Sequence, residues 1–310
     1  MSESKCKICS SSDIRKLFTS KNVHGRHLLG NENFSVIECL ECKAVFTDIA
    51  IDAGYYEKYY LDDYYTPASA TNNVVVRVVL RWVDFLGHRR RLKILRKFLK
   101  GGNKLLEIGC GRGAFLARLP KLLDKYGVEI NDDGAAYVKA HYPDVTIYQE
   151  KIDAPEFPGN QKYDAIVMWH VLEHIDDPNT FLPALKKLLN TNGFLICDIP
   201  NRDSLGFAIA KSSWFHLDTP RHLFFYNYTS LQSLLKRHQL EIVSSSADPY
   251  YYFHDLSASL YGMLKRNNRF IDILLFVLIV PMTLVVRFIV SIFWPQKAEI
   301  NTYVITHSQD

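Results

Sequence analysis

Short apolar runs alternate with amphipathic stretches along the middle of the chain. An apolar run of about four to eight residues favours a strand buried on both faces, and the stretches between the runs favour helices. We expect strands at 104–109, 126–130, 144–149, 163–169 and 194–199, and helices at 113–124, 132–141 and 179–190. This alternation predicts an α/β fold built on a parallel sheet.

The same patterns continue toward the end of the chain. A helix at 228–238 and a strand at 240–247 add a sixth step, and the segment NTYVITHS predicts one more strand. Tyr303 and Ile305 would lie on one face of that strand and Val304 on the other, because side chains alternate along a strand.

A long helix is predicted before this core, from Thr71 or Asn72 to Lys100, where Gly101 and Gly102 stop it. Its first half has a broad apolar side. Its second half is basic, with Arg89, Arg90, Arg91, Lys93, Arg96 and Lys97. A solvated face is the usual interpretation of such a run, and the alternative is attraction to an anionic membrane or a phosphate-bearing substrate.

Three glycines follow the first core strand, in the stretch KLLEIGCGRGAFLARL of residues 104–119. Glycine allows the tight turn and the close approach of backbone N–H groups to a nucleotide-like ligand. The spacing is E-x-G-x-G-x-G rather than the dinucleotide pattern G-x-G-x-x-G. Glu107 would repel a pyrophosphate and attract a cation, so the pattern predicts S-adenosylmethionine (SAM), with its sulfonium and ammonium groups, and disfavours a nucleotide-dependent oxidoreductase.

Four segments, LLEIGCGRGAF, YGVEI, YDAIVMWHVLEHIDDP and GFLICDIPN, resemble the successive motifs of class I SAM-dependent methyltransferases. The resemblance covers residues 100 to 250 and implies a Rossmann-like, seven-stranded core with an antiparallel last strand. SAM would lie across the carboxyl ends of strands one and two, with Glu129 on its ribose hydroxyls. The cofactor-binding residues expected on this basis are Glu107, Gly109, Cys110, Gly111, Gly113, Glu129, Ile130, Ile152, Asp153 and His170.

Four of the six cysteines form two C-x2-C pairs. In a reducing compartment such pairs predict a tetrahedral structural zinc site in a small ribbon over residues 1–50, and two redox pairs are the alternative. The first 20 residues are polar and unlike a signal peptide, so we expect a cytoplasmic protein. The arrangement resembles bacterial sugar and polysaccharide methyltransferases that carry a ribbon before the core. The expected zinc ligands are Cys6, Cys9, Cys39 and Cys42.

The segment WFHLDTPRHLFFY follows the fifth strand and is both polar and aromatic, which suits an acceptor pocket. O-Methylation needs a base for the acceptor proton, and His216 and His222 are the candidates. Arg221 could bind a phosphate or carboxylate of the acceptor. The alternative is that Pro-Arg-His only caps and pins the next helix.

Two other segments carry candidate chemistry. His170, Glu173 and His174 could share one helical side and bind a divalent metal, but we favour hydrogen bonding within the loop beside SAM. Residues 54–65 hold six tyrosines, which predict packing between domains rather than ligand contact.

Residues 270–294 are almost continuously apolar, interrupted by Pro281 and Arg287. Proline disfavours a continuous helix. We therefore expect two short helices, 271–280 and 282–293, as a hairpin on the inner face of the cytoplasmic membrane, with Lys265, Arg266, Arg269 and Lys297 toward anionic head groups. Burial in the protein's own core or in a homodimer interface is the alternative.

The expected organisation is a zinc ribbon at 1–50, a helical linker at 51–100 and a methyltransferase domain at 101–310 with a helical hairpin insert at 255–297. The first acceptor hypothesis is a sugar hydroxyl on a lipid-linked or nucleotide-linked glycan precursor. A lipid-quinone phenol and a non-catalytic SAM-binding scaffold are the alternatives. A net charge of +4 gives no reason to expect nucleic acid.

Overall fold

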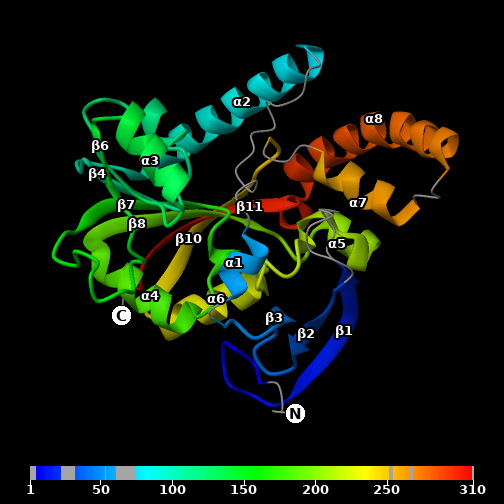
Figure 1. Ribbon diagram of the computed structural model, residues 1–310, viewed down its shortest axis with the longest axis horizontal. Helices are drawn as coiled ribbons and strands as arrows, with labels where there is room; N and C mark the ends of the chain where they lie inside the picture. The colour runs from blue at the N-terminus through cyan, green and yellow to red at the C-terminus, as the bar shows by residue number, and fades with distance from the viewer. Residues whose placement is uncertain are drawn as a thin grey trace.

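The computed structural model describes residues 5–21, 32–52, 54–60, 74–250, 254–264 and 268–308. These residues form two sheets. Helices α7 Asp255–Leu264 and α8 Arg269–Phe293 project from one side of the larger sheet (Figure 1). The predicted start of the long helix, at Thr71 or Asn72, lies outside the described residues, as do Lys265 and Arg266.

The larger sheet has seven strands in the order β10-β11-β8-β7-β4-β5-β6. Strand β11 is antiparallel to both of its neighbours, and the other pairs are parallel. This arrangement confirms the predicted Rossmann-like core with a last strand inserted beside strand six. The strands are β4 Lys104–Ile108, β5 Asp124–Val128, β6 Val145–Tyr148, β7 Tyr163–Trp169, β8 Leu189–Pro200, β10 Leu240–Ala247 and β11 Ile300–His307.

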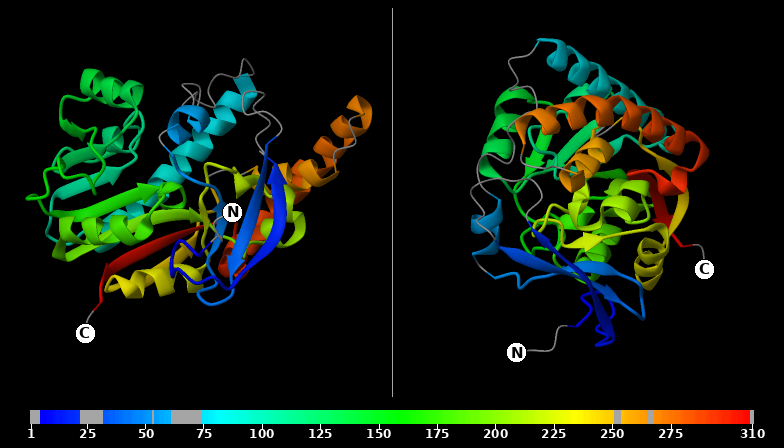
Figure 2. Two further views of the ribbon diagram at one scale, coloured as in Figure 1. Left: turned by 60° about the horizontal axis from the view of Figure 1, so that its bottom comes forward. Right: turned by 90° about the vertical axis from the view of Figure 1, so that its right-hand side faces the viewer.

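Helices cover both faces of this sheet (Figures 1 and 2). Alternate residues of each central strand enter different core clusters, as a period of two requires. Leu106 and Ile166 pack with α4 Pro178–Leu188 and α6 Tyr228–Arg237, whereas Leu105 and Val167 pack with residues of α2 Val74–Phe98 and α3 Asp132–His141. The result is a three-layer α/β core.

The predicted helix at 113–124 is wrong. Only one 3-10 turn forms there, at Leu116–Arg118. Pro120 disfavours helical dihedrals at the residue before it, and Leu119 is extended with ψ 149°. Strand β5 then begins at Asp124, two residues earlier than expected, so the chain has no room for a longer helix.

The smaller sheet has the order β1-β2-β3-β9, and its pairs are antiparallel. Its strands are β1 Ile14–Lys21, β2 Asn33–Cys39, β3 Val45–Asp48 and β9 Phe224–Phe225. The last of these belongs to the segment that was predicted as an acceptor loop. Residues on both sides of the predicted domain boundary at residue 50 thus contribute strands to one sheet. That boundary stays a prediction.

The insert between β10 and β11 contains α7 Asp255–Leu264 and α8 Arg269–Phe293. Helix α8 continues through Pro281, so the expected break into 271–280 and 282–293 is wrong. The Thr283 hydroxyl donates back along the helix to the carbonyl oxygens of Ile279 at 2.8 Å and of Val280 at 3.0 Å. None of the helices in the described ranges combines the length and hydropathy needed to cross a membrane.

Arg287 is buried on the inward side of α8. Its guanidinium donates to Asp255 Oδ1 of α7 at 2.7 Å and to the carbonyl oxygen of Asp248 at 3.2 Å. Burial raises the pKa of the Asp255 carboxyl to about 6, although Arg287 opposes that shift. The pair therefore fixes which side of α8 faces the protein.

Replacing Arg287 by Met should destabilise the protein by about 3–5 kcal/mol, because the Asp255 carboxylate would stay buried without its cation. Urea unfolding followed by circular dichroism measures this change. The matched control is Arg89→Met on the exposed surface of α2, for which a change of about 0.5 kcal/mol or less is expected. Equal stability of the two variants would contradict this account of α8.

Candidate functional site

The glycine loop lies at the carboxyl end of β4, where open α/β sheets bind ligands. Gly109, Gly111 and Gly113 have φ of +67°, +54° and +71°, a region that favours glycine. A Cβ on Gly109 would lie 2.7 Å from a methyl of Val171, so the space there is closed to any larger residue. The loop therefore needs glycine for both its dihedrals and its packing.

Glu129 directly follows β5 and is buried beside this loop. Its carboxylate accepts hydrogen bonds from the backbone N–H of Gly111 at 2.7 Å and from that of Asn131 at 2.9 Å. These two bonds tie the loop after β4 to the end of β5. Glu129 thus holds the glycine loop in place and could also receive a ribose.

Glu107 is buried within β4, and its Oε2 atom has no hydrogen-bond partner among the described residues. Burial raises the pKa of Glu107 to about 8, with Arg91 opposing the shift and Glu129 adding to it. A buried carboxyl of this kind is costly unless a cation compensates it. The arrangement fits a ligand with an ammonium or sulfonium group, as SAM has.

Arg91 was assigned to a solvated basic face, and this expectation is wrong. Its guanidinium is buried, lies 2.8 Å from Asp198 Oδ2 and stands 4.3 Å from the ring centre of Trp169. Arg90 is likewise turned inward and donates to Thr302 Oγ1 at 2.7 Å. In the sequence these arginines belong to a run of basic residues, and such a run does not show which side chains point inward.

The remaining expected cofactor residues also follow core strands. Cys110 and Ile152 are buried, whereas Ile130 and Asp153 are exposed. His170 directly follows β7 with φ +58°, and its Nδ1 lies 3.4 Å from Glu173 Oε1. Their contacts with SAM stay predictions.

The three candidate acceptor residues are buried and engaged within the protein. His216 Nε2 lies 3.0 Å from Asp255 Oδ2, and Arg221 forms an ion pair with Asp218. His222 Nδ1 lies 2.7 Å from the carbonyl oxygen of His216. Burial holds the pKa of His222 well below its usual range, so the ring is neutral near pH 7.

Glu173, His174 and His222 come together, with one ligand-type atom of each within 4.8 Å of the others. A 3-10 turn at Leu172–His174 and the left-handed His170 replace the expected helical arrangement. His170 keeps a contact with Glu173, and His222 joins Glu173 and His174. Neutral imidazoles beside a buried carboxylate can accept a proton, and the same set could bind a divalent cation.

The described tyrosines of the aromatic segment pack against this cluster. The Tyr55 hydroxyl donates to the carbonyl oxygen of Pro220 at 3.0 Å, and the Tyr60 hydroxyl lies 3.0 Å from His174 Nδ1. The segment includes α1 Tyr55–Tyr59. It therefore covers the candidate acceptor loop, as packing between the predicted domains requires.

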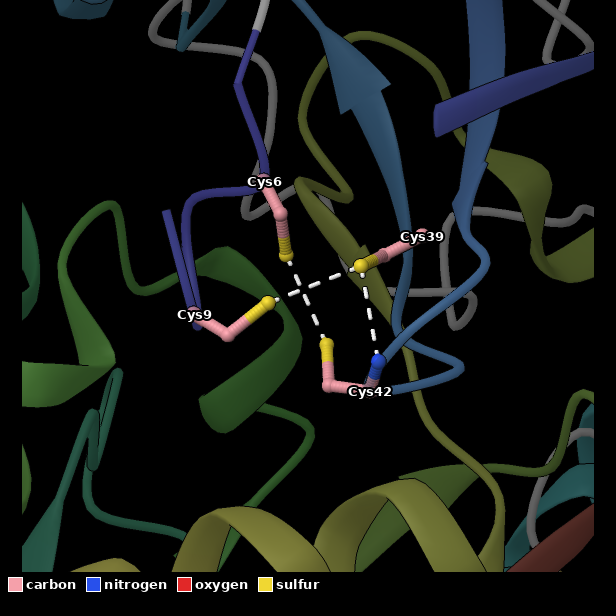
Figure 3. A group of neighbouring side chains, drawn as sticks. All are labelled: Cys6, Cys9, Cys39 and Cys42. Atoms are coloured by element: carbon pink, nitrogen blue, oxygen red, sulfur yellow. Dashed lines mark hydrogen bonds between the residues drawn. The ribbon is translucent and has the colours of Figure 1, made fainter. Parts of the chain in front are cut away.

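The four paired cysteines converge in the N-terminal part (Figure 3). Sulfur atoms lie 3.5 Å apart between Cys6 and Cys42 and between Cys9 and Cys39, and all four lie within 4.8 Å of one another. Backbone N–H groups of Ile8 and Cys42 donate to two of the sulfurs. A hydrogen bond from Cys42 lowers the pKa of the Cys6 thiol to about 5. This donor set fits a tetrahedral Zn²⁺ ion.

Comparison with known proteins places this core in a family. The family model described as "Methyltransferase domain" matches residues 79–245, more than half of the chain. The chain therefore belongs to this family, and its core is a class I SAM-dependent methyltransferase domain.

Curated relatives include two ubiquinone biosynthesis O-methyltransferases. The protein of Cereibacter sphaeroides is 32% identical over 117 residues, which cover 35% of this chain and 46% of the relative. That of Proteus mirabilis is 27% identical over 157 residues, or 45% and 60%. The chain thus spans about half the length of these relatives.

Two solved structures are similar to this chain. A SAM-dependent methyltransferase from Clostridium acetobutylicum is 12% identical, with 82% of this chain and 99% of that chain covered and a TM-score of 0.46. An O-methyltransferase of Brevibacillus brevis, solved with S-adenosyl-L-homocysteine, is 17% identical, with 75% and 79% covered and a TM-score of 0.43.

Glu129→Ala should weaken SAM binding by about 1–3 kcal/mol, because ribose hydroxyls would lose their acceptor and the glycine loop its anchor. Calorimetry measures the affinity. Asp124→Ala, at the opposite end of the same strand, is the control and should bind SAM as the wild type does. Unchanged affinity in the Glu129 variant would rule out its role at the ribose.

SAM binding should release about one proton near pH 7. Glu107 is mostly protonated in the free protein, since its pKa is about 8, and a bound cation would favour the ionised form. Calorimetry in two buffers of different ionisation enthalpy counts the protons. Glu107→Gln should remove most of this release, and identical proton counts for both proteins would contradict the proximity of Glu107 to the cation.

Proposed function

We propose that this chain O-methylates a hydroxyl on a lipid-borne acceptor, with SAM as the methyl donor. The observation that carries the proposal is the buried Oε2 atom of Glu107, which has no hydrogen-bond partner among the described residues, beside a glycine loop anchored by Glu129. SAM supplies a methyl group bonded to a sulfonium. Glu107 and Glu129 bind its charged and hydroxyl-bearing parts and orient it against the candidate acceptor loop.

His222 is the proposed base for the acceptor hydroxyl. Its ring is neutral, so it can take up the proton that the hydroxyl loses. The carboxylate of Asp218 favours the protonated ring and opposes the effect of burial. Glu173 has the same effect on the neighbouring His174, whose ring centre stands 4.6 Å from that of His222. Two carboxylates thus stabilise a proton on this histidine pair.

A phenolic hydroxyl of a lipid quinone is the first candidate acceptor, since the curated relatives carry the name of ubiquinone O-methylation. A sugar hydroxyl on a lipid-linked or nucleotide-linked glycan precursor is the second. It is favoured by the cysteine cluster, whose ribbon resembles those of polysaccharide methyltransferases. Radiolabelled SAM incubated with separated lipid and glycan fractions, followed by mass spectrometry of the product, distinguishes the two acceptors from a protein that binds SAM without catalysis.

His222→Gln should lower kcat for this acceptor by roughly 10²–10⁴-fold while SAM affinity stays unchanged, since only proton removal is affected. His141→Gln, at an exposed position on α3, is the control. A His222 variant with full activity would remove this residue from the reaction and leave the cofactor assignment untouched.

We also propose one structural zinc ion per chain, held by Cys6, Cys9, Cys39 and Cys42. Elemental analysis of protein purified without chelator should give about one zinc, and Cys39→Ala should lose it, because three thiolates bind far more weakly than four. Cys110→Ala lies outside the cluster and should keep the metal. Zinc retention in both variants, or an absence of zinc in the wild type, would favour redox pairs.

Peripheral contact with the inner face of the cytoplasmic membrane through residues 270–294 completes the proposal. It would bring a lipid-borne acceptor to the enzyme. A homodimer through the same residues is the alternative.

A further inference from the structure

Helix α8 presents apolar side chains outward and its one mid-helix charge inward. Between residues 278 and 293, Arg287 is the only charged residue, and it is buried together with Ile279 and Thr283. The outward side carries Leu278, Met282, Val285, Ile289 and Ile292, each between 40% and 61% exposed. Their spacing of three and four residues makes one continuous stripe along the helix. Exposed apolar patches of this extent mark interaction sites.

Helix α2 contributes cations beside this stripe. Arg89, Lys93 and Arg96 are exposed and follow one another at i, i+4 and i+7, so they lie on one side of the helix. No ion pair of these three occurs within the described part of the chain. Their neighbours Arg90 and Arg91 are instead paired with Asp248 and Asp198. Three positive charges thus remain available on the surface.

A groove of about 640 Å³ joins the two helices. Its apolar wall includes Leu86 of α2 with Phe288 and Ile292 of α8, and none of its described lining residues is acidic. The lining cations are Arg89, Arg90, Lys93 and Arg96. Both helices project from the same side of the central sheet (Figures 1 and 2). The surface therefore offers a row of positive charge directly beside a strip of hydrocarbon.

We propose that this α2–α8 surface binds the face of a bilayer rich in anionic phospholipid, with the α8 stripe in the acyl region and the α2 cations at the phosphates. The 25 residues of α8 make a rod about 37 Å long, which suits a helix lying in the plane of the interface. The inference deepens the membrane contact proposed above. It adds α2 as the source of charge and so makes binding selective for anionic lipid.

A second copy of the chain fits this surface less well. A symmetric dimer would bring the same patch against itself, and the cations of one α2 would approach those of the other or remain unneutralised. Anionic head groups neutralise them without any such constraint. Charge complementarity therefore selects the bilayer as the occupant.

Flotation with vesicles tests the proposal. The wild type should float with phosphatidylglycerol-containing vesicles, remain behind with pure phosphatidylcholine vesicles, and dissociate as salt is raised. The triple variant Arg89→Glu, Lys93→Glu, Arg96→Glu should lose at least ten-fold in vesicle-bound fraction. The control triple variant Lys121→Glu, Lys139→Glu, Lys236→Glu changes the net charge equally at exposed positions elsewhere and should float.

A second variant tests the apolar half. Met282→Gln, Val285→Gln and Ile289→Gln together should abolish flotation while SAM affinity stays at the wild-type value, which shows that the core is folded. Flotation of the charge-reversed triple variant, or equal flotation with neutral vesicles, would overturn the proposal. The proposal would also be overturned if the wild type did not bind vesicles and instead formed a dimer, and if the glutamine variant were monomeric. Because SAM affinity is measured separately, failure here is distinct from failure of the methyltransferase proposal.

Discussion

The pairing of β3 with β9 is the contact that joins the N-terminal sheet to the methyltransferase core. The Thr47 N–H donates to the carbonyl oxygen of Leu223 at 2.9 Å, and the Thr47 hydroxyl donates to that of His222 at 2.7 Å. On the other side, the Leu223 N–H donates to the carbonyl oxygen of Glu173 at 2.8 Å. One short segment therefore connects the cysteine-containing sheet to the carboxyl end of β7. The N-terminal sheet is thus hydrogen-bonded directly to the backbone of His222.

The features that sequence reasoning predicted are those encoded locally. Strands β4 and β7 are mostly apolar, and both faces of each are covered, so burial accounts for the pattern. The glycine loop and Glu129 were predicted because a strand, a glycine turn and an acid at a fixed distance form a pattern that can be recognised in the sequence. The cysteine cluster was predicted because the two cysteines of each C-x2-C pair lie in one tight loop. Their separation in the sequence therefore sets how close they lie in space.

The features that were missed depend on partners far away in sequence. Arg91 turns inward because Asp198, 107 residues later, lies within reach of its guanidinium. Strand β9 has two residues, too few to show any periodicity, and it exists only because β3 offers an edge. His222 lies beside Glu173 and His174 because the chain between them folds back. In each case the deciding contact joins residues that are far apart in the sequence, so a local sequence pattern cannot reveal it.

The orientation of α8 follows from the same kind of competition. Turning the helix by half a rotation would bury its apolar stripe, which lowers the free energy. It would also take Arg287 away from Asp255 and leave that carboxyl buried without the arginine cation. Asp255 also lies against His216 of the acceptor loop, so the loss would spread there. A buried ion pair adds little net stability, yet it admits only one arrangement of its partners. The exposed stripe on α8 and the buried charge beneath it are therefore two consequences of a single orientation, which also ties the insert to the loop that carries His222.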